Sequence, residues 1–191
     1  MAIISISTVT KEASIFIKGD GKSIFRIVKG DDMLKKLPLT LKEMLDEYDF
    51  FKEPIDKLII SGGPGYYTSI RIGESFAKGI LIGDDIKKLK RVNSLEVLGA
   101  MSIKHKRVIA ILKARRDVYH CAVFSVSKDD IMNRETDDML INEKELERWR
   151  GIMGVGEGLK YLKNGWENSD EKIISPDAES MFKYLNGEKI V

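Results

Sequence analysis

The chain has 191 residues, of which 43% are hydrophobic and 32% charged, with a formal net charge of +2 and a single cysteine. This composition is ordinary for a globular protein; it excludes an internal disulfide framework, a cysteine metal cluster and any apolar run of membrane-spanning length. The start of the chain has no basic region of the kind that opens a signal peptide, and we expect a cytoplasmic protein.

Charge is spread unevenly along the chain. Residues 1–120 contain 22 of the 32 Lys and Arg but only 15 of the 30 Asp and Glu. Basic runs at 87–91, 104–107 and 115–116 could attract an RNA backbone. Such runs are more often the solvated ends of elements, and no aromatic residues interleave them. We therefore expect at most weak or indirect contact with RNA.

The first predicted elements are strands. Alternating apolar residues predict them over 3–8, 13–17 and 23–28. Between the last two, Gly19-Asp20-Gly21 predicts a hairpin turn.

From Asp31 the apolar period becomes that of an amphipathic helix with a narrow seam. The seam residues are Leu34, Leu37, Leu41, Met44, Tyr48 and Phe51. Pro38 lies inside this pattern, so the helix is expected to kink there or to begin late. The seam can face either the core or another subunit.

A glycine-rich turn follows a strand predicted over 57–61. Its sequence is Ser61-Gly62-Gly63-Pro64-Gly65, and a helix is predicted over 68–82. The glycines permit a sharp strand-to-helix turn, and Thr68 or Ser69 can cap the helix. Such a turn could hold phosphate, but it matches neither the P-loop nor the G-x-G-x-x-G spacing. We favour a tight turn with close packing.

Three small residues, Ser69, Gly73 and Ala77, recur every four positions in this helix. They form a strip without bulk on one face, which permits close approach by another helix.

The first part of the chain ends with a strand and a helix, and from the second hairpin, which resembles the first, the chain reads as a reduced copy. Predicted elements are a strand at 90–92, a helix at 93–102, and strands at 107–113 and 118–126 about a turn at 115–117. Residues 129–150 are ambiguous, with a loop and a helix near 143–149. Strands at 152–155 and 173–174, a helix at 157–162 and a last helix starting at Ser175-Pro176 complete the chain. We divide it into lobes at 1–103 and 104–191.

The glycine turn and its helix resemble the signature of the TsaB (YeaZ) family, which runs close to R-G-P-G-S-F-T-G-x-R-I-G-x-x-x-A-K-G. The matching residues are Gly63, Pro64, Gly65, Thr68, Arg71, Ile72, Gly73, Ala77, Lys78 and Gly79. Tyr67 replaces Phe, whereas Gly62, Tyr66 and Ser69 depart from the pattern. Residues 92–96 and 114–119 are also similar to family segments, and the resemblance covers about residues 1–125.

The resemblance implies an α/β protein with a two-lobed actin-like (RNase H-like, ASKHA) fold, in which mixed sheets are flanked by helices. It implies a non-catalytic partner subunit for tRNA threonylcarbamoyladenosine modification that binds the TsaD transferase, is joined by the TsaE ATPase, and is a homodimer in isolation. The implied contact uses the first-lobe helices. The expected partner-binding residues are Leu34, Leu41, Met44, Ser69, Arg71, Gly73 and Ala77. The residues expected to be structural are Gly63, Pro64, Gly65 and Thr68.

Residue types that catalysis would require are missing. ATP-using actin-like proteins place an Asp at the end of the first strand, where this chain has Ser7, whose hydroxyl lacks the charge that a hard cation needs. The family's histidine at the head of the first helix falls on Asp32. His105 and His120 lack metal-ligand spacing, and Cys121 reads as a small core residue. We expect no catalytic residue, no metal and no cofactor.

Two alternatives stay open: an ATP-dependent enzyme of the actin-like fold, and a glycopeptidase-like hydrolase. Ser7 and the lack of a second glycine-rich phosphate hairpin argue against the first. No zinc-ligand set and no Ser–His–Asp or Cys–His signature supports the second.

Overall fold

The structure, a computed structural model, describes residues 1–29, 32–47 and 54–190. The strands of its first sheet are β1 (Ala2–Ser7), β2 (Ala13–Gly19), β3 (Lys22–Val28), β4 (Ile55–Ser61) and β5 (Leu89–Val92). Their order is β3-β2-β1-β4-β5; β1, β2 and β3 are antiparallel, whereas β4 and β5 run parallel to β1. The strands and the hairpin predicted here are confirmed.

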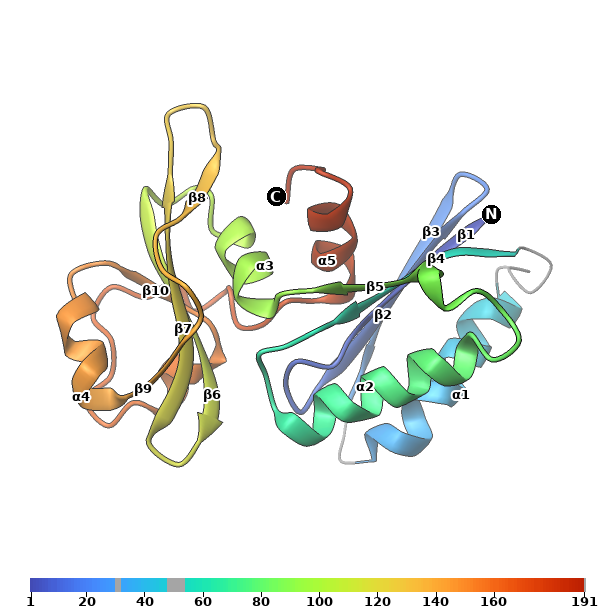
Figure 1. The fold of residues 1–191 in the computed structure, drawn as a ribbon, viewed down its shortest axis with the longest axis horizontal. Coiled ribbons are helices and arrows are strands. Elements are labelled where there is room, and N and C mark those ends of the chain that lie inside the picture. The colour runs from blue at the N-terminus through green and yellow to red at the C-terminus, as the bar shows by residue number, and fades with distance from the viewer. Residues whose placement is uncertain (30–31, 48–53, 191) are drawn as a thin grey trace.

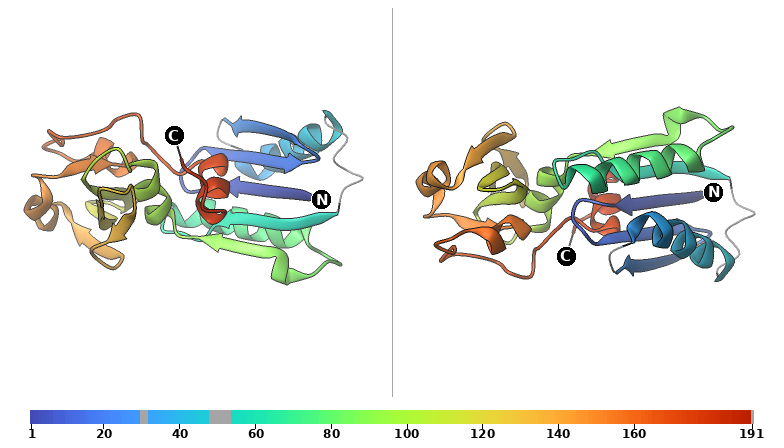
Figure 2. Two further views of the ribbon diagram at one scale, coloured as in Figure 1. Left: turned by 90° about the horizontal axis from the view of Figure 1, so that it is seen from above. Right: turned by 90° about the horizontal axis from the view of Figure 1, so that it is seen from below.

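Alternating side chains of the first sheet point to opposite faces, and each face packs into its own hydrophobic core. Ile4, Ile6 and Ile15 pack beneath helices α1 (Met33–Glu47) and α2 (Tyr67–Ile80). Phe16 and Ile59, on the other face, pack against helix α5 (Ala178–Leu185). Figure 2 shows α5 in front of the sheet from above, and α1 and α2 in front of it from below. The period of two in the sequence therefore builds a three-layer first lobe.

The helix predicted from the leucine seam is present, and it runs through Pro38 rather than starting after it. Leu37, Leu41 and Met44 are buried in the core below it. The seam residues Tyr48 and Phe51 lie outside the described residues. The short 3-10 helix η2 (Ile86–Lys88) follows α2 and leads into β5.

The second sheet repeats the arrangement of the first. Its strands are β6 (Arg107–Arg115), β7 (Val118–Val126), β8 (Met132–Arg134), β9 (Met139–Asn142) and β10 (Met153–Val155). The order is β10-β6-β7-β8, with β9 also paired to β7. β6, β7 and β8 are antiparallel and β10 is parallel to β6, as β4 is to β1. The shared strand order and directions support the expected copy, whereas a smaller lobe with the bounds 104–191 stays a prediction.

In the second lobe the helices that connect the strands are shorter than in the first. Helix α4 (Glu143–Leu146) and the 3-10 helix η3 (Glu147–Trp149) precede β10, and the 3-10 helix η4 (Glu157–Tyr161) follows it. A single parallel bridge between Gly154 and Ser169 stands where the first lobe has β5. The ambiguous stretch contains two short strands, β8 and β9, that the sequence did not predict. The strand predicted at 173–174 is wrong, because those residues have no strand pairing.

Each half of the chain sends one helix across to the other. Helix α3 (Ser94–Met101) follows the first sheet, yet Leu95 and Leu98 are buried against the second. Helix α5 follows the second sheet and packs on the first (Figure 1). Its start differs from the prediction, since Asp177 is the N-cap and Pro176 precedes it. The division at residue 103 stays a prediction, because packing crosses it in both directions.

The two sheets together have the topology of the two-lobed actin-like fold, with a strand order and strand directions shared by both lobes. No helix among the described residues is long and apolar enough to cross a membrane.

Candidate functional site

The glycine turn packs on its own chain. A Cβ on Gly65 would lie 2.6 Å from the carbonyl oxygen of Val9, and one on Gly62 would lie 3.1 Å from the Cβ of Arg91. Gly63 has φ of +92°, a left-handed conformation that glycine adopts without strain. Ser94 N–H donates to the Gly63 carbonyl at 2.8 Å. Along the chain the turn connects β4 to α2. Through this hydrogen bond it also holds the start of α3 close to the end of β4.

The predicted helix cap is wrong. The N-cap of α2 is Tyr66, and no side chain caps it. Thr68 is the second residue of the helix and is exposed. The helix starts earlier than predicted because Tyr66 N–H bonds to the Val9 carbonyl at 2.9 Å, which fixes the chain at that point.

The prediction that the small-residue strip of α2 faces a partner is wrong. Ser69 and Ala77 are buried, and a Cβ on Gly73 would lie 2.3 Å from Oγ1 of Thr8 at the end of β1. The strip lacks bulk because α2 sits closely on the first sheet, not because a second subunit lies against it. Leu41 and Met44 are likewise buried in the core.

The outward face of the same helices carries different residues. Leu34 on α1 is 67% exposed and Tyr67 on α2 is 68% exposed. The Arg71 guanidinium lies 4.5 Å from the centroid of the Tyr67 ring, so the two form a cation–π pair in solvent. α1 and α2 lie side by side on one face of the sheet (Figures 1 and 2). Of the seven predicted partner-binding residues, only Leu34 and Arg71 are available to a partner.

Beside this face, Glu74 of α2 is held by two cations. Arg91 forms a paired contact with its carboxylate, and the Lys78 ammonium lies 3.1 Å away. Arg91 and then Lys78 lower the pKa of Glu74 against the opposing effect of burial. At this end of the face, the negative charge of Glu74 is therefore balanced by the positive charges of Arg91 and Lys78.

Two serines of the first sheet are hydrogen-bonded to the segment that leads into α5. The Ser7 hydroxyl, at the end of β1, donates to the Pro176 carbonyl at 2.6 Å. The Ser14 hydroxyl accepts from Ala178 N–H at 2.9 Å, at the start of α5. Both serines are buried. The position where the resemblance would place a metal-binding carboxylate is thus occupied by a hydrogen bond within the chain.

A contact between two tyrosine hydroxyls links the glycine turn to η4. The hydroxyls of Tyr66, from the glycine turn, and Tyr161, from η4, are 3.3 Å apart. The Lys113 ammonium lies 3.6 Å from the centroid of the Tyr161 ring, and Lys113 N–H donates to Glu157 at 3.1 Å. Glu157 is buried, and burial raises its pKa against the attraction of nearby lysines. Burial and the Tyr161 contact also raise the pKa of Tyr66.

His120 and Cys121 lie on β7. Cys121 is fully buried, as predicted for a small core residue, and burial raises the pKa of its thiol to about 12. His120 lines a cavity of about 430 Å³ together with Asn93 and Asp138. Burial lowers the pKa of His120, which favours a neutral imidazole. Asn93 donates to Asp138 at 2.7 Å, a further link between the two halves of the chain.

Sequence reasoning missed three residues of this region, and two of them had no sequence signal. Tyr66 and Tyr161 are 95 positions apart, and nothing in either segment indicates that they meet. Tyr67 could have been found, since it lies off the buried strip of its helix by the same periodicity that defines the strip.

Comparisons with known proteins converge on one family. The family model described as TsaD, tRNA N6-adenosine threonylcarbamoyltransferase, matches residues 31–147, more than half of the chain. The Escherichia coli tRNA threonylcarbamoyladenosine biosynthesis protein TsaB is 25% identical over 95% of this chain and 84% of that protein. The Bacillus subtilis protein of the same name is 27% identical over 65% of this chain and 55% of its own length.

Solved structures agree on the fold. YeaZ from Pseudomonas aeruginosa superposes with a TM-score of 0.75 at 18% identity, covering 97% of this chain and 93% of that one. At this identity the likeness shows a shared fold.

Proposed function

Because the chain belongs to the TsaB (YeaZ) family, we propose that it is a non-catalytic partner subunit in the formation of threonylcarbamoyladenosine on tRNA. It binds a TsaD-like transferase, a TsaE-like ATPase joins the complex, and in isolation it forms a homodimer. It acts in the cytoplasm and contacts tRNA weakly or indirectly. The names of its relatives support the pathway.

The non-catalytic role rests on one observation, the Ser7 hydrogen bond. The hydroxyl has no formal charge with which to hold a hard cation, and it is already committed to the Pro176 carbonyl at 2.6 Å. A metal-bound phosphate would have to displace the segment that leads into α5. An ATP-using enzyme is therefore the weaker alternative.

Calorimetric titration with Mg-ATP tests this role. We expect no micromolar binding by the native protein, and no ATP hydrolysis by the Ser7→Asp variant, because Pro176 still occupies the space in front of residue 7. Tight binding by the native protein would reinstate the enzymatic alternative.

The partner surface is assigned to the outward face of α1 and α2, defined by Leu34, Tyr67 and Arg71. The exposed Tyr67–Arg71 pair supports this assignment, because tyrosine and arginine are enriched at protein interfaces, and Leu34 adds exposed apolar area on the adjacent helix. Because the inward strip is already packed, association would leave the fold of the first lobe unchanged.

The test is capture of a TsaD homologue from the same organism by matched variants. Leu34→Asp and Arg71→Glu are each expected to weaken capture by about tenfold or more, because each places a new charge in the interface. Leu140→Asp is the control, since Leu140 is 56% exposed but lies on β9 of the second lobe. Sedimentation of the same variants tests the homodimer. Equal capture by all three variants would rule out this surface, whatever the role in the pathway.

A further inference from the structure

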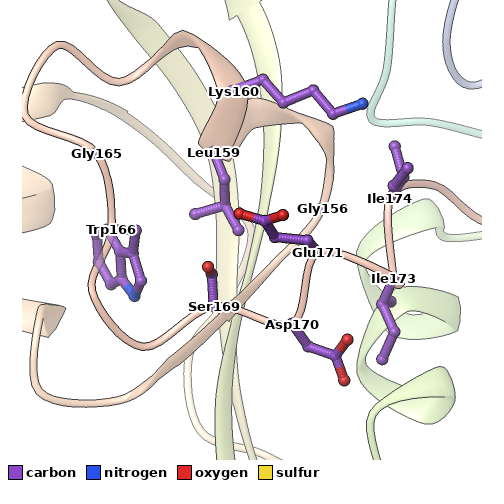
Figure 3. Close-up of a pocket in the computed structure, with 10 residues that line it drawn as sticks. All are labelled: Gly156, Leu159, Lys160, Gly165, Trp166, Ser169, Asp170, Glu171, Ile173 and Ile174. Atoms are coloured by element: carbon purple, nitrogen blue, oxygen red, sulfur yellow. The ribbon is translucent and has the colours of Figure 1, made fainter.

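A cavity of about 390 Å³ lies in the second lobe between η4 and the segment 165–174 (Figure 3). In the first lobe the equivalent position after the parallel strand holds the long helix α2 and the strand β5. Here a 3-10 helix and the single bridge at Ser169 take their place. The cavity is the space that this shortened connection leaves open.

The walls of the cavity are largely apolar. Leu159, Trp166 and Ile173 line it. Trp166 is 8% exposed, and its indole N–H donates to the Ile152 carbonyl at 3.1 Å. The indole N–H is therefore satisfied within the chain and is not available as a donor to a ligand.

Two of the three charged groups on the rim are directed elsewhere. The Asp170 carboxylate binds the Lys104 ammonium at 2.7 Å and the His105 ring at 3.1 Å, and Figure 3 shows it turned away from Trp166. The Lys160 side chain extends away from Trp166 (Figure 3), and its positive charge acts on buried Glu157 in the same 3-10 helix.

The third charge, Glu171, is an exposed residue on the rim whose side chain is directed over the cavity. Its carboxylate points across the cavity toward Leu159, and the Ser169 hydroxyl points in from below (Figure 3). Within the part of the chain that the structure describes, no hydrogen bond or ion pair engages the Glu171 side chain. The cavity thus combines apolar walls with one free carboxylate and one hydroxyl.

We propose that this cavity binds a small organic cation, an alkyl or arylalkyl ammonium compound. The ammonium group donates to the Glu171 carboxylate and to the Ser169 hydroxyl, and the hydrocarbon body lies against Leu159, Trp166 and Ile173. An ammonium group has three donors and no acceptor, which suits a carboxylate and a hydroxyl at one end of an apolar cavity. This site is independent of the partner surface on α1 and α2.

The chain has two tryptophans, so the fluorescence of Trp166 can be isolated in the Trp149→Phe background. In the described structure Trp149 Nε1 is buried without a hydrogen-bond partner, so the replacement of Trp149 by Phe removes no hydrogen bond. The probes are three compounds with one phenyl body: 2-phenylethylamine, 2-phenylethanol and 3-phenylpropionate. We expect saturable binding of the amine, about tenfold weaker binding of the alcohol, and the weakest binding of the anion.

Glu171→Gln is expected to lower the affinity for the amine about tenfold, to that of the alcohol, and to leave the alcohol unaffected. Glu167→Gln is the matched control, because it removes the same charge from the same segment outside the cavity lining. The proposal is overturned if the three probes bind alike, if none saturates, if the anion binds best, or if both Gln variants weaken the amine equally.

Discussion

The two lobes share one strand order but differ in how their parallel strands are connected. In the first lobe, β4 is flanked by helices of 15 and 14 residues. In the second, β10 is flanked by a helix of 4 residues and a 3-10 helix of 5. Both parallel strands end in a glycine-containing turn that packs closely on a neighbouring strand. The two lobes therefore share the strand order of the sheet and the closely packed glycine turn, whereas the lengths of their helices differ.

The largest expected effect comes from the close packing of Gly73 in α2 against Thr8, the residue that follows β1. Gly73→Leu would drive even its Cβ to within 2.3 Å of Thr8 Oγ1, with three further carbons to place. We expect a loss of more than about 3 kcal/mol in the free energy of unfolding, measured by urea denaturation.

Gly79→Ala is the control for this effect. It lies in the same helix, and a Cβ added there would meet no atom within 4 Å. Replacement is expected to stabilise the protein by about 0.5 kcal/mol, since alanine has the higher helix propensity. A Gly73→Leu protein as stable as the native one would restore the view that this strip faces a partner.

The next largest effects are expected in α3 and α5, the two helices that each pack on the sheet of the other half of the chain. Phe182→Ala in α5 removes a 3% exposed ring whose centroid lies 5.1 Å from that of Phe16. We expect a loss of about 3–5 kcal/mol, with hydrogen exchange accelerated first in β1 and β2 of the first lobe.

Leu98→Ala is the reciprocal change, in a fully buried residue of α3. It is expected to cost about 2–5 kcal/mol and to accelerate exchange first in β6 and β7. If each variant instead loosened the sheet nearest to it in sequence, the crossing of the helices would be wrong.

Most elements of the first lobe could be predicted from the sequence because their apolar periods are long and regular. The strands β8 and β9, of 3 and 4 residues, are too short to show a period. The orientation of the Ser69–Gly73–Ala77 strip could not be predicted, because small residues four apart suit a helix on its own sheet as well as a helix on a partner. Contacts such as Ser7 with Pro176, 169 positions apart, arise only from the crossing of α5.

The smallest expected effects are two opposite dependences of stability on pH in the second lobe. Lys104 and His105 lower the pKa of Asp170 to about 2, below the value of about 3.9 for an unfolded chain. Its contribution is therefore present above pH 4 and is lost as the pH falls toward 2. Burial raises the pKa of Glu157 above its ordinary value, so its contribution is present at low pH and is lost as the pH rises through the raised value.

Urea unfolding midpoints measured from pH 2.5 to 8 distinguish the contributions of the two carboxylates. Asp170 contributes to the fall in stability toward low pH, the acid limb, and Glu157 to the fall in stability as the pH rises above 4. Asp170→Asn is expected to flatten the acid limb alone, because it removes the group that must be protonated there. Glu157→Gln is expected to flatten the limb above pH 4 alone, while its amide oxygen still accepts from Lys113 N–H. The first lobe offers a matched control in Glu74→Gln, which removes a carboxylate whose pKa is lowered by Arg91 and should affect only the acid limb. Should the acid limb of Asp170→Asn be as steep as that of the native protein, and the limb above pH 4 survive in Glu157→Gln, the pH dependence would originate outside the second-lobe connection, and the reduced connection would not be the part of the fold that responds to pH.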